Sequence, residues 1–227
     1  MKRLLIFFLF LAPVFALNAQ SVDLLWQGET YRPPFYEGRS LWSYQSIIKF
    51  VAIPQGLGDP TTLNYKWTKN GTVLGMVSGV GRNFLSFEDD VFSKPQEVKV
   101  EIISTDKKVL AEAKTTVRPQ SAVLLVYENN PLYGYLFNRE IGAGYRLREG
   151  EVTFSAFPLF ATPATRDGAN LSYSWTTSDG EIQSGSSVTY RAPEDAEGTS
   201  EVMLNISNSH KILVDLNRNF LVQFGNE

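Results

Sequence analysis

The sequence predicts an all-β protein built from two tandem antiparallel β-sandwiches that follow an N-terminal signal peptide. Two observations carry this prediction. Short segments in which apolar and polar residues alternate are separated by clusters of Gly, Asn, Asp and Ser, and no helical period appears outside the leader. In addition, the pattern Leu-x-Tyr-x-Trp-Thr occurs at residues 63–68 and again at 171–176. A chain that carries one strand pattern twice, about a hundred residues apart, is typical of a duplicated domain.

The first residues, MKRLLIFFLFLAPVFALNAQ, have the three parts of a secretory signal peptide. Two basic residues precede an apolar run from Leu4 to Leu17, and small and polar residues follow. The run is shorter than the roughly 20 residues of a transmembrane helix. Cleavage after Ala16 or Ala19 fits the pattern, and an uncleaved N-terminal anchor is the alternative. We therefore assign residues 1–20 to a signal peptide or anchor and expect an exported protein of the cell surface, the periplasm or envelope, or the extracellular space.

Composition narrows the function classes. The chain of 227 residues has a net charge of −3, which becomes −5 without Lys2 and Arg3 because 19 basic residues then face 24 acidic ones. This balance argues against nucleic acid as a partner. The chain has no cysteine, which excludes disulfides, thiol catalysis and Cys-ligated zinc. Each core must therefore be stable through packing alone.

The duplication extends beyond the tryptophans, and the matching segments keep their order along the chain. Phe50–Pro54 matches Phe154–Pro158, and Glu97-Val98 matches Glu201-Val202, both with an offset of 104 residues. Further matches lie on either side, at 34–36 with 131–133 and at 104–110 with 207–213. The offsets change only where loops would absorb insertions, so we expect two copies of one domain.

Each copy contains three segments that read as strands. They are residues 47–53, 63–67 and 98–102 in the first copy and residues 151–157, 171–175 and 202–206 in the second. Turn-forming sequences separate them, at residues 56–60, 69–71 and 105–107 in the first copy and 178–180 in the second. Strands at intervals of about 8–12 residues favour a sandwich or a barrel.

The second copy resembles bacterial immunoglobulin-like domains of the PKD type. The residues that carry the resemblance are Thr153–Ala156, Leu171–Trp175, Asp179-Gly180, Val188–Tyr190 and Glu201–Leu204, with Gly58–Pro60 and Leu63–Trp67 in the first copy. Both copies lack the Phe-Gly-Asp-Gly of that family after the tryptophan, so the resemblance is to PKD-like, not bona fide PKD, domains. The aromatic-rich segments 22–44 and 122–145 lie outside it and look like exported bacterial proteins with no assigned activity.

The resemblance implies two immunoglobulin-like sandwiches, each with one large aromatic side chain buried between its sheets. We expect Trp67 and Trp175 to fill this place, with Tyr65 and Tyr173 on the same faces. Pro119 marks the boundary, because proline ends a strand. The predicted domains are residues 21–118 and 119–227, joined by a linker too short for free tumbling.

Few residues suggest chemistry. His210 is the only histidine, and we interpret it as a surface turn residue at the position of Lys107 in the other copy. The acidic clusters at 88–90 and 194–197 read as solvated loops, with calcium binding as the less favoured alternative. We predict no catalytic residue, no metal site and no cofactor; an enzyme would need a cleft with convergent carboxylates.

Aromatic residues crowd two corresponding segments, and four of them are the candidate partner-binding residues: Tyr36, Trp42, Tyr133 and Tyr135. Exposed aromatic residues dominate binding hot spots. The alternative is that they cover one end of a sandwich or seal the contact between the domains, and exposure decides between the two interpretations.

The sequence therefore favours a non-enzymatic exported protein that acts as a scaffold, spacer or adhesion module through contact with other envelope or surface proteins. The alternative is a carbohydrate-binding module that uses the aromatics on a polysaccharide. Contact with a membrane is expected only through an uncleaved leader.

Overall fold

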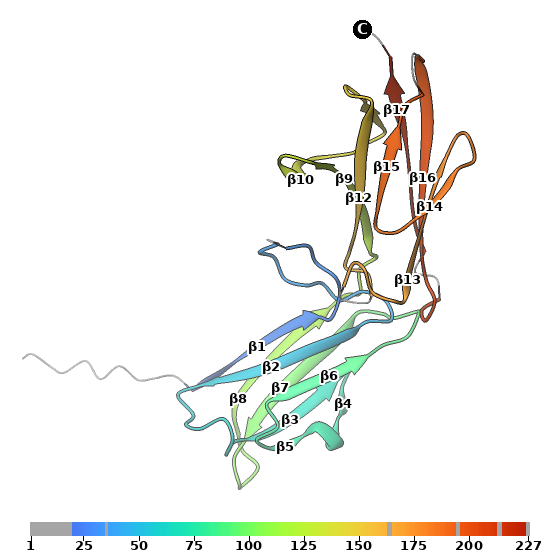
Figure 1. Ribbon diagram of the computed structural model, residues 1–227. Helices are drawn as coiled ribbons and strands as arrows, with labels where there is room; N and C mark the ends of the chain where they lie inside the picture. Colours follow the sequence, from blue (N-terminus) through green and yellow to red (C-terminus); the bar gives the residue numbers. More distant parts are fainter. Residues whose placement is uncertain (1–19, 35, 163–164, 194–195, 213–214, 226–227) are drawn as a thin grey trace, which may run out of the picture.

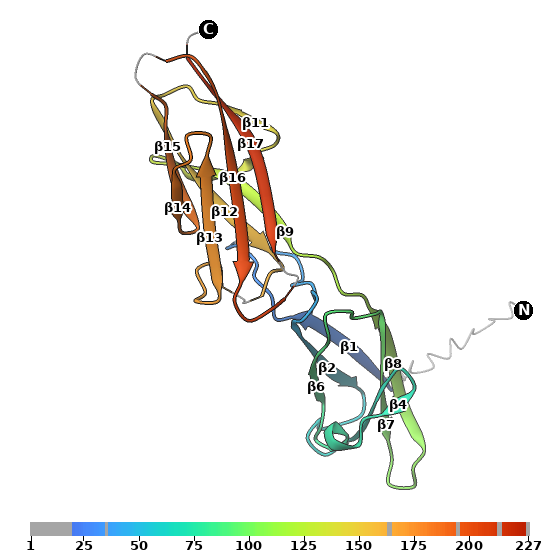
Figure 2. The same cartoon turned by 90° about the vertical axis from the view of Figure 1, so that its right-hand side faces the viewer.

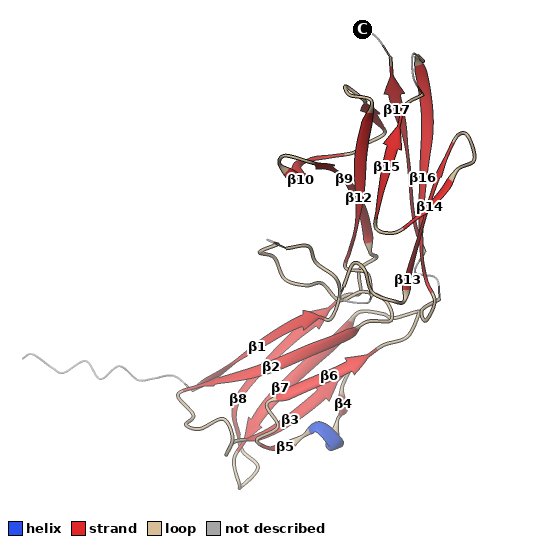
Figure 3. Ribbon diagram, in the orientation of Figure 1, coloured by secondary structure: helices blue, strands red, loops and turns tan. Residues whose placement is uncertain are grey.

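The computed structural model describes residues 20–34, 36–162, 165–193, 196–212 and 215–225. In this part of the chain all regular structure is strand except one 3₁₀ turn, η1 (Gly75–Val77) (Figure 3). The leader, apart from Gln20, lies outside the described residues. Within the described ranges no helix is long and apolar enough to cross a membrane.

The first half of the chain folds into two antiparallel sheets, which we call the first sandwich. One sheet has the order β1 (Ser21–Gly28), β2 (Ile47–Gln55), β6 (Phe84–Glu88). The other has the order β4 (Thr72–Val73), β3 (Asn64–Lys69), β7 (Gln96–Ile103), β8 (Val109–Val117), and β5 (Gly79–Val80) also pairs with β3. The first two strands thus share a sheet with β6, a strand from the middle of the domain. The last two strands, β7 and β8, belong to the sheet of the Tyr-x-Trp strand β3.

The second half repeats this order in a second sandwich. One sheet runs β10 (Gly134–Glu140), β9 (Val123–Asn130), β12 (Glu151–Leu159), β15 (Ser187–Arg191). The other runs β11 (Gly144–Arg146), β17 (Leu216–Phe224), β16 (Gly198–Asn208), β13 (Leu171–Thr177), β14 (Ile182–Ser184). The additions are β10, which pairs with β9, and β11, which pairs in parallel with β17. This strand order confirms the predicted fold class, two tandem immunoglobulin-like sandwiches.

Each sandwich has its own core, and every buried apolar residue of one core comes from one half of the chain. Trp67 is 0% and Trp175 1% exposed, each between the two sheets of its sandwich. Tyr65 and Tyr173, two residues earlier, are buried as well. The alternation of the Tyr-x-Trp strands places both side chains on the inner face, because the side-chain period of a strand is two.

The two copies also share their strand register. Trp67 lies opposite Val100 in the first sandwich, and Trp175 lies opposite Leu204 in the second. Val100 and Leu204 are 104 residues apart, the offset that the sequence shows for this strand. The duplication therefore preserved the packing as well as the sequence pattern.

The sandwiches lie end to end and are bent at their junction (Figure 1), and the elongated outline persists in the perpendicular view (Figure 2). β8 ends at Val117 and β9 begins at Val123, so five residues connect the two. The loop between β1 and β2 and the β9–β10 hairpin both project on the same side of the junction (Figure 1).

Candidate functional site

The loop that follows β1 pairs with the second sandwich through its backbone. The N–H of Tyr31 donates to the carbonyl of Ala161 at 2.8 Å, and the N–H of Phe160 donates to the carbonyl of Tyr31 at 2.8 Å. The Tyr31 side chain is buried at this contact. Two reciprocal backbone bonds and a buried ring fix the loop against the end of β12.

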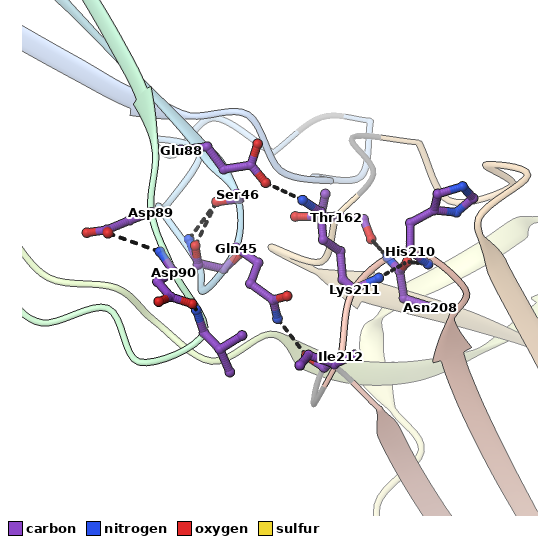
Figure 4. Close-up of polar contacts among 12 residues, drawn as sticks. Gln45, Ser46, Glu88, Asp89, Asp90, Thr162, Asn208, His210, Lys211 and Ile212 are labelled. Atoms are coloured by element: carbon purple, nitrogen blue, oxygen red, sulfur yellow. Dashed lines mark hydrogen bonds and ion pairs between the residues drawn. The ribbon is translucent and has the colours of Figure 1, made fainter.

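Three further contacts lie at the junction between the sandwiches. On the linker, the N–H of Gln120 donates to the carbonyl of Trp42 at 2.8 Å. Beyond it, Lys211 pairs with Glu88, and the side-chain amide of Gln45 donates to the carbonyl of Ile212 at 2.5 Å (Figure 4). Contacts from separate segments resist rotation in more than one direction, so the angle between the sandwiches is restrained.

An open cleft of about 600 Å³ lies between the β1–β2 loop and the second sandwich. Its first wall is Tyr31, Arg32, Pro33, Pro34 and Tyr36, and its second wall is Tyr135, Phe157, Thr165, Arg166 and Asp167. This size is within the usual range of ligand-binding clefts, and junctions between domains are a usual place for them.

The guanidinium of Arg166 lies at the centre of the second wall, between two aromatic rings. Its Cζ is 5.5 Å from the ring centroid of Tyr135 and 4.9 Å from that of Phe157. Its Nη2 donates to the hydroxyl of Tyr135 at 3.3 Å, and its Nε is 3.7 Å from the carboxylate of Asp167. Such cation–π pairs are stronger when the cation is partly desolvated, and this side chain is only 16% exposed.

The core of the second sandwich holds the backbone of Arg166 in place. The hydroxyl of Tyr173 donates to the carbonyl of Arg166 at 2.5 Å. In the first sandwich, the hydroxyl of Tyr65 donates to the carbonyl of Pro60 at 3.1 Å in the corresponding loop. The tyrosine predicted as a core residue therefore also positions the cationic side chain of the cleft.

Burial dominates the electrostatics of the tyrosines at this junction. It raises the pKa of Tyr173 well above its usual value of 10.0, and it also raises the pKa of Tyr31. Burial opposes the charge of Arg166, but the hydrogen bond to Tyr135 and the neighbouring carboxylate of Asp167 favour that charge, and the pKa of Arg166 is raised. The walls of the cleft therefore carry two cationic side chains, Arg32 and Arg166, and one carboxylate, Asp167.

The structure separates the four aromatic residues that the sequence grouped. Tyr36 and Tyr135 line the cleft. Tyr133 is 78% exposed at the tip of the β9–β10 hairpin, outside the cleft. The expectation that Trp42 offers a binding surface is wrong, because it is 0% exposed and its indole N–H donates to the carbonyl of Ser46 at 3.0 Å. Trp42 instead packs edge-to-face on Phe87 in the first core.

Sequence reasoning missed Arg166, Tyr31 and Phe157 as cleft residues. Phe157 belongs to a predicted strand, but its outward position gives no sign that another segment covers it. Arg166 and Tyr31 lie in loops of the two different domains, and only the bend at the junction brings them together. The one available signal was the run of aromatic residues and prolines at 31–36.

The other sequence candidates lie elsewhere. His210 is exposed in the turn after β16. At the first acidic cluster, Glu88 pairs with Lys211, while Asp89 accepts a hydrogen bond from Gln96 at 2.8 Å. Within the described residues no three His, Asp or Glu side chains are grouped to hold a metal ion. Residues 194–195 of the second cluster lie outside the described ranges.

No protein-family model and no curated protein matches this chain, so the resemblance to PKD-type domains stays a prediction. Two solved structures align with most of it. The fibronectin(III)-like modules of Clostridium thermocellum CbhA are 12% identical with a TM-score of 0.30, over 88% of this chain and 93% of that chain. The central fibronectin-III array of RIM-binding protein is 10% identical with a TM-score of 0.27, over 88% of this chain and 69% of that chain. These scores are low, and the fold assignment depends on the strand order and the two cores described above.

Proposed function

We propose that this chain is a non-catalytic, exported interaction module whose cleft holds an extended acidic segment of a partner protein. The two sandwiches act as a bent scaffold, and the junction between them forms the binding site. The leader-like sequence of residues 1–20 supports export, and the proposed partners are other proteins of the envelope or surface.

The observation that carries this proposal is the incomplete hydrogen bonding of Arg166. A guanidinium has five N–H donors. In the described part of the chain, one of them donates to Tyr135, and the contact with Asp167 exceeds hydrogen-bond distance. The remaining donors are free to bind a carboxylate of a ligand, for which the forked geometry of arginine is suited. Arg32 on the opposite wall adds a second cation.

The arrangement of the rings favours a peptide over a polysaccharide. A sugar platform needs an open ring face, but Tyr135 is packed against Phe157 at 87° and against Phe137 at 45°, with Arg166 over its ring. The cleft therefore offers ring edges, hydroxyls, the cations Arg32 and Arg166, and the carboxylate of Asp167. Extended peptides dock in aromatic-lined grooves of this kind, and an acidic side chain finds its partner in Arg166.

Titration of the ¹⁵N-labelled protein with the probe peptide Ac-Glu-Tyr-Glu-Tyr-Glu-NH₂ tests the proposal. We expect amide shifts at residues 31, 32, 36, 135 and 165–167, and at least about tenfold weaker binding by Arg166→Gln, since a charge-assisted hydrogen bond contributes about 1.5–3 kcal/mol. Arg191→Gln is the matched control, because Arg191 is exposed and outside the cleft.

Three results would contradict the proposal: no shift at these amides, equal binding of the Gln-for-Glu peptide, or equal binding by Arg166→Gln. Cellohexaose provides the comparison with the alternative function. If cellohexaose shifts the cleft amides and the peptide does not, the carbohydrate-binding interpretation replaces this one.

A further inference from the structure

The outer face of the β1–β2–β6 sheet is apolar and open. Leu25, Val51, Ile53 and Phe84 are all exposed on it. Val51 lies directly opposite Leu25 on β1 and opposite Phe84 on β6, so these three form one row across the sheet. The row borders a shallow hollow of about 530 Å³, with Arg39 and Lys49 at its rim. We call the surface formed by Leu25, Val51, Ile53 and Phe84 the open face.

The second sandwich covers the same position with part of its own chain. Ile53 corresponds to Phe157 at the repeat offset of 104. Ile53 is 38% exposed, whereas Phe157 is 1% exposed. The cover is β10, from which Phe137 and Tyr135 pack on Phe157 with ring centroids 5.2 and 5.1 Å away. The duplicated domain therefore shows which kind of group fits this face, namely aromatic side chains of a hairpin.

Among the residues that the structure describes, nothing of this kind covers the first sandwich, because the segment after β1 leads elsewhere. Instead of turning back, it crosses to the second sandwich, where Tyr31 pairs with Phe160 and Ala161 and Tyr36 packs edge-to-face on Phe160 at 6.0 Å. The segment after the first strand thus has a different role in each copy. In the second copy this segment covers its own sheet, whereas in the first copy it docks on the neighbouring sandwich.

The tip of the β9–β10 hairpin has no neighbour within the described chain that covers it. Leu132 and Tyr133 are 85% and 78% exposed. In sequence, Pro131-Leu132-Tyr133 matches Pro34-Phe35-Tyr36, the stretch of the first copy that ends in the docking residue Tyr36. The molecule thus presents a docking segment on its second sandwich and an uncovered face on its first.

We propose that a second copy of this chain is the occupant, and that the hairpin tip at Leu132 and Tyr133 of one copy docks on the open face of the next. Within the chain, the matching segment of the first copy already docks on a neighbouring sandwich, where Tyr36 packs on Phe160. An open apolar face and an exposed apolar tip are both typical of interaction sites.

The charges of the two sandwiches favour this head-to-tail arrangement. Residues 20–119 carry 12 basic and 11 acidic side chains, whereas residues 120–227 carry 7 and 13, so the net charges are +1 and −6. Contact between two second sandwiches would bring like charges together, while contact between a first and a second sandwich would not. The contact is heterologous and leaves one tip and one face free, so it generates open rows of molecules.

Sedimentation velocity on the purified protein tests this inference with two variants. Val51→Glu places a charge on the open face, and the double variant Leu132→Ser with Tyr133→Ser removes the tip. All three positions are exposed, so both variants keep their cores. We expect the wild-type protein to associate with increasing concentration, and each variant alone to stay monomeric.

An equimolar mixture of the two variants provides the distinguishing result. Each variant lacks one half of the contact, so the mixture is expected to form a 1:1 dimer and no larger species. Met76→Ser, at a distant exposed position, should associate as the wild type does. A wild type that is monomeric at about 0.5 mM, or a mixture that stays monomeric, would overturn the inference. Neither variant alters a cleft residue, so failure here is distinct from failure of the proposed function.

Discussion

Trp175 makes in the second sandwich the same indole hydrogen bond that Trp67 makes in the first. The indole N–H of Trp67 donates to the carbonyl of Arg82, and that of Trp175 to the carbonyl of Gly185, both at 2.8 Å. Each acceptor lies two residues before the strand that completes the other sheet, β6 or β15. Each indole therefore ties its own sheet to the loop that leads into the opposite sheet.

Replacing either indole by a phenyl ring tests this relationship. Trp67→Phe and Trp175→Phe each leave a part-buried carbonyl without its donor, which costs about 1–3 kcal/mol of unfolding free energy. Urea denaturation should show similar losses for the two variants. The exposed Leu132→Ser serves as control, with an expected change within about 0.5 kcal/mol. A loss in only one of the two sandwiches would show that the two sites are not equivalent.

Stability in acid should depend on Glu101. This carboxylate accepts hydrogen bonds from Lys66 at 2.8 Å and Lys99 at 3.0 Å, and these hold its pKa below the usual value of 4.5. A folded-state pKa below the unfolded one means that the contribution is complete above about pH 4.5 and is lost as the pH falls through the folded-state pKa.

We therefore expect the unfolding free energy of the wild type to fall more steeply below this pH than that of Glu101→Gln. Urea denaturation at a series of pH values between neutral and pH 3 measures the two slopes. Parallel slopes for the two proteins would mean that the pair with the lysines does not perturb Glu101.

Position 28 should tolerate no residue larger than glycine, because the backbone of residues 41–42 passes directly beside Gly28. A Cβ at Gly28 would lie 2.3 Å from the carbonyl oxygen of Leu41. Gly28→Ala therefore forces apart two backbone segments that frame Trp42, at a cost of about 1–3 kcal/mol. Gly150→Ala is the matched control, since nothing lies within 4 Å of its Cβ position. Thermal unfolding of the two variants compares them, and equal midpoints would contradict this account.

The angle between the sandwiches should depend on Tyr31 far more than on the ion pair between Glu88 and Lys211. That pair is exposed, and such pairs contribute about 0–1 kcal/mol. Tyr31 is buried and its backbone bonds both Phe160 and Ala161. Small-angle X-ray scattering should show a broader distribution of sizes for Tyr31→Ala and an unchanged profile for Glu88→Gln. Identical profiles for the wild type and Tyr31→Ala would contradict a role of the Tyr31 side chain in setting the angle.

The sequence was sufficient for the parts of the fold that depend on local pattern. Period-two alternation around Trp67 and Trp175 predicted buried indoles, and the repeat predicted two copies of one strand order. These features need no long-range information, because a strand with one apolar face must bury that face. The strand β10 was not predicted, since its pairing with β9 and its packing on Phe157 have no counterpart in the sequence pattern.

The candidate site was predictable only in part. Tyr36 and Tyr135 belong to the aromatic-rich segments 22–44 and 122–145, and both line the cleft. Trp42 belongs to the first of these segments but is buried, because the loop turns inward at this point to cover the end of the first core. Composition cannot distinguish an aromatic residue that lines the cleft from one that is buried in the core. Arg166 acquires its role from the bend between the sandwiches, which depends on contacts between loops far apart in the sequence.

Hydrogen exchange of the whole protein carrying Trp175→Ala tests most directly whether two sandwiches close around separate tryptophans. Removing this buried ring costs about 3–5 kcal/mol. Amide protection is expected to fall in the strands between Val123 and Phe224 and to stay at wild-type levels in those between Ser21 and Val117. Equal loss of protection in both sets of strands would show one cooperative unit and contradict the account.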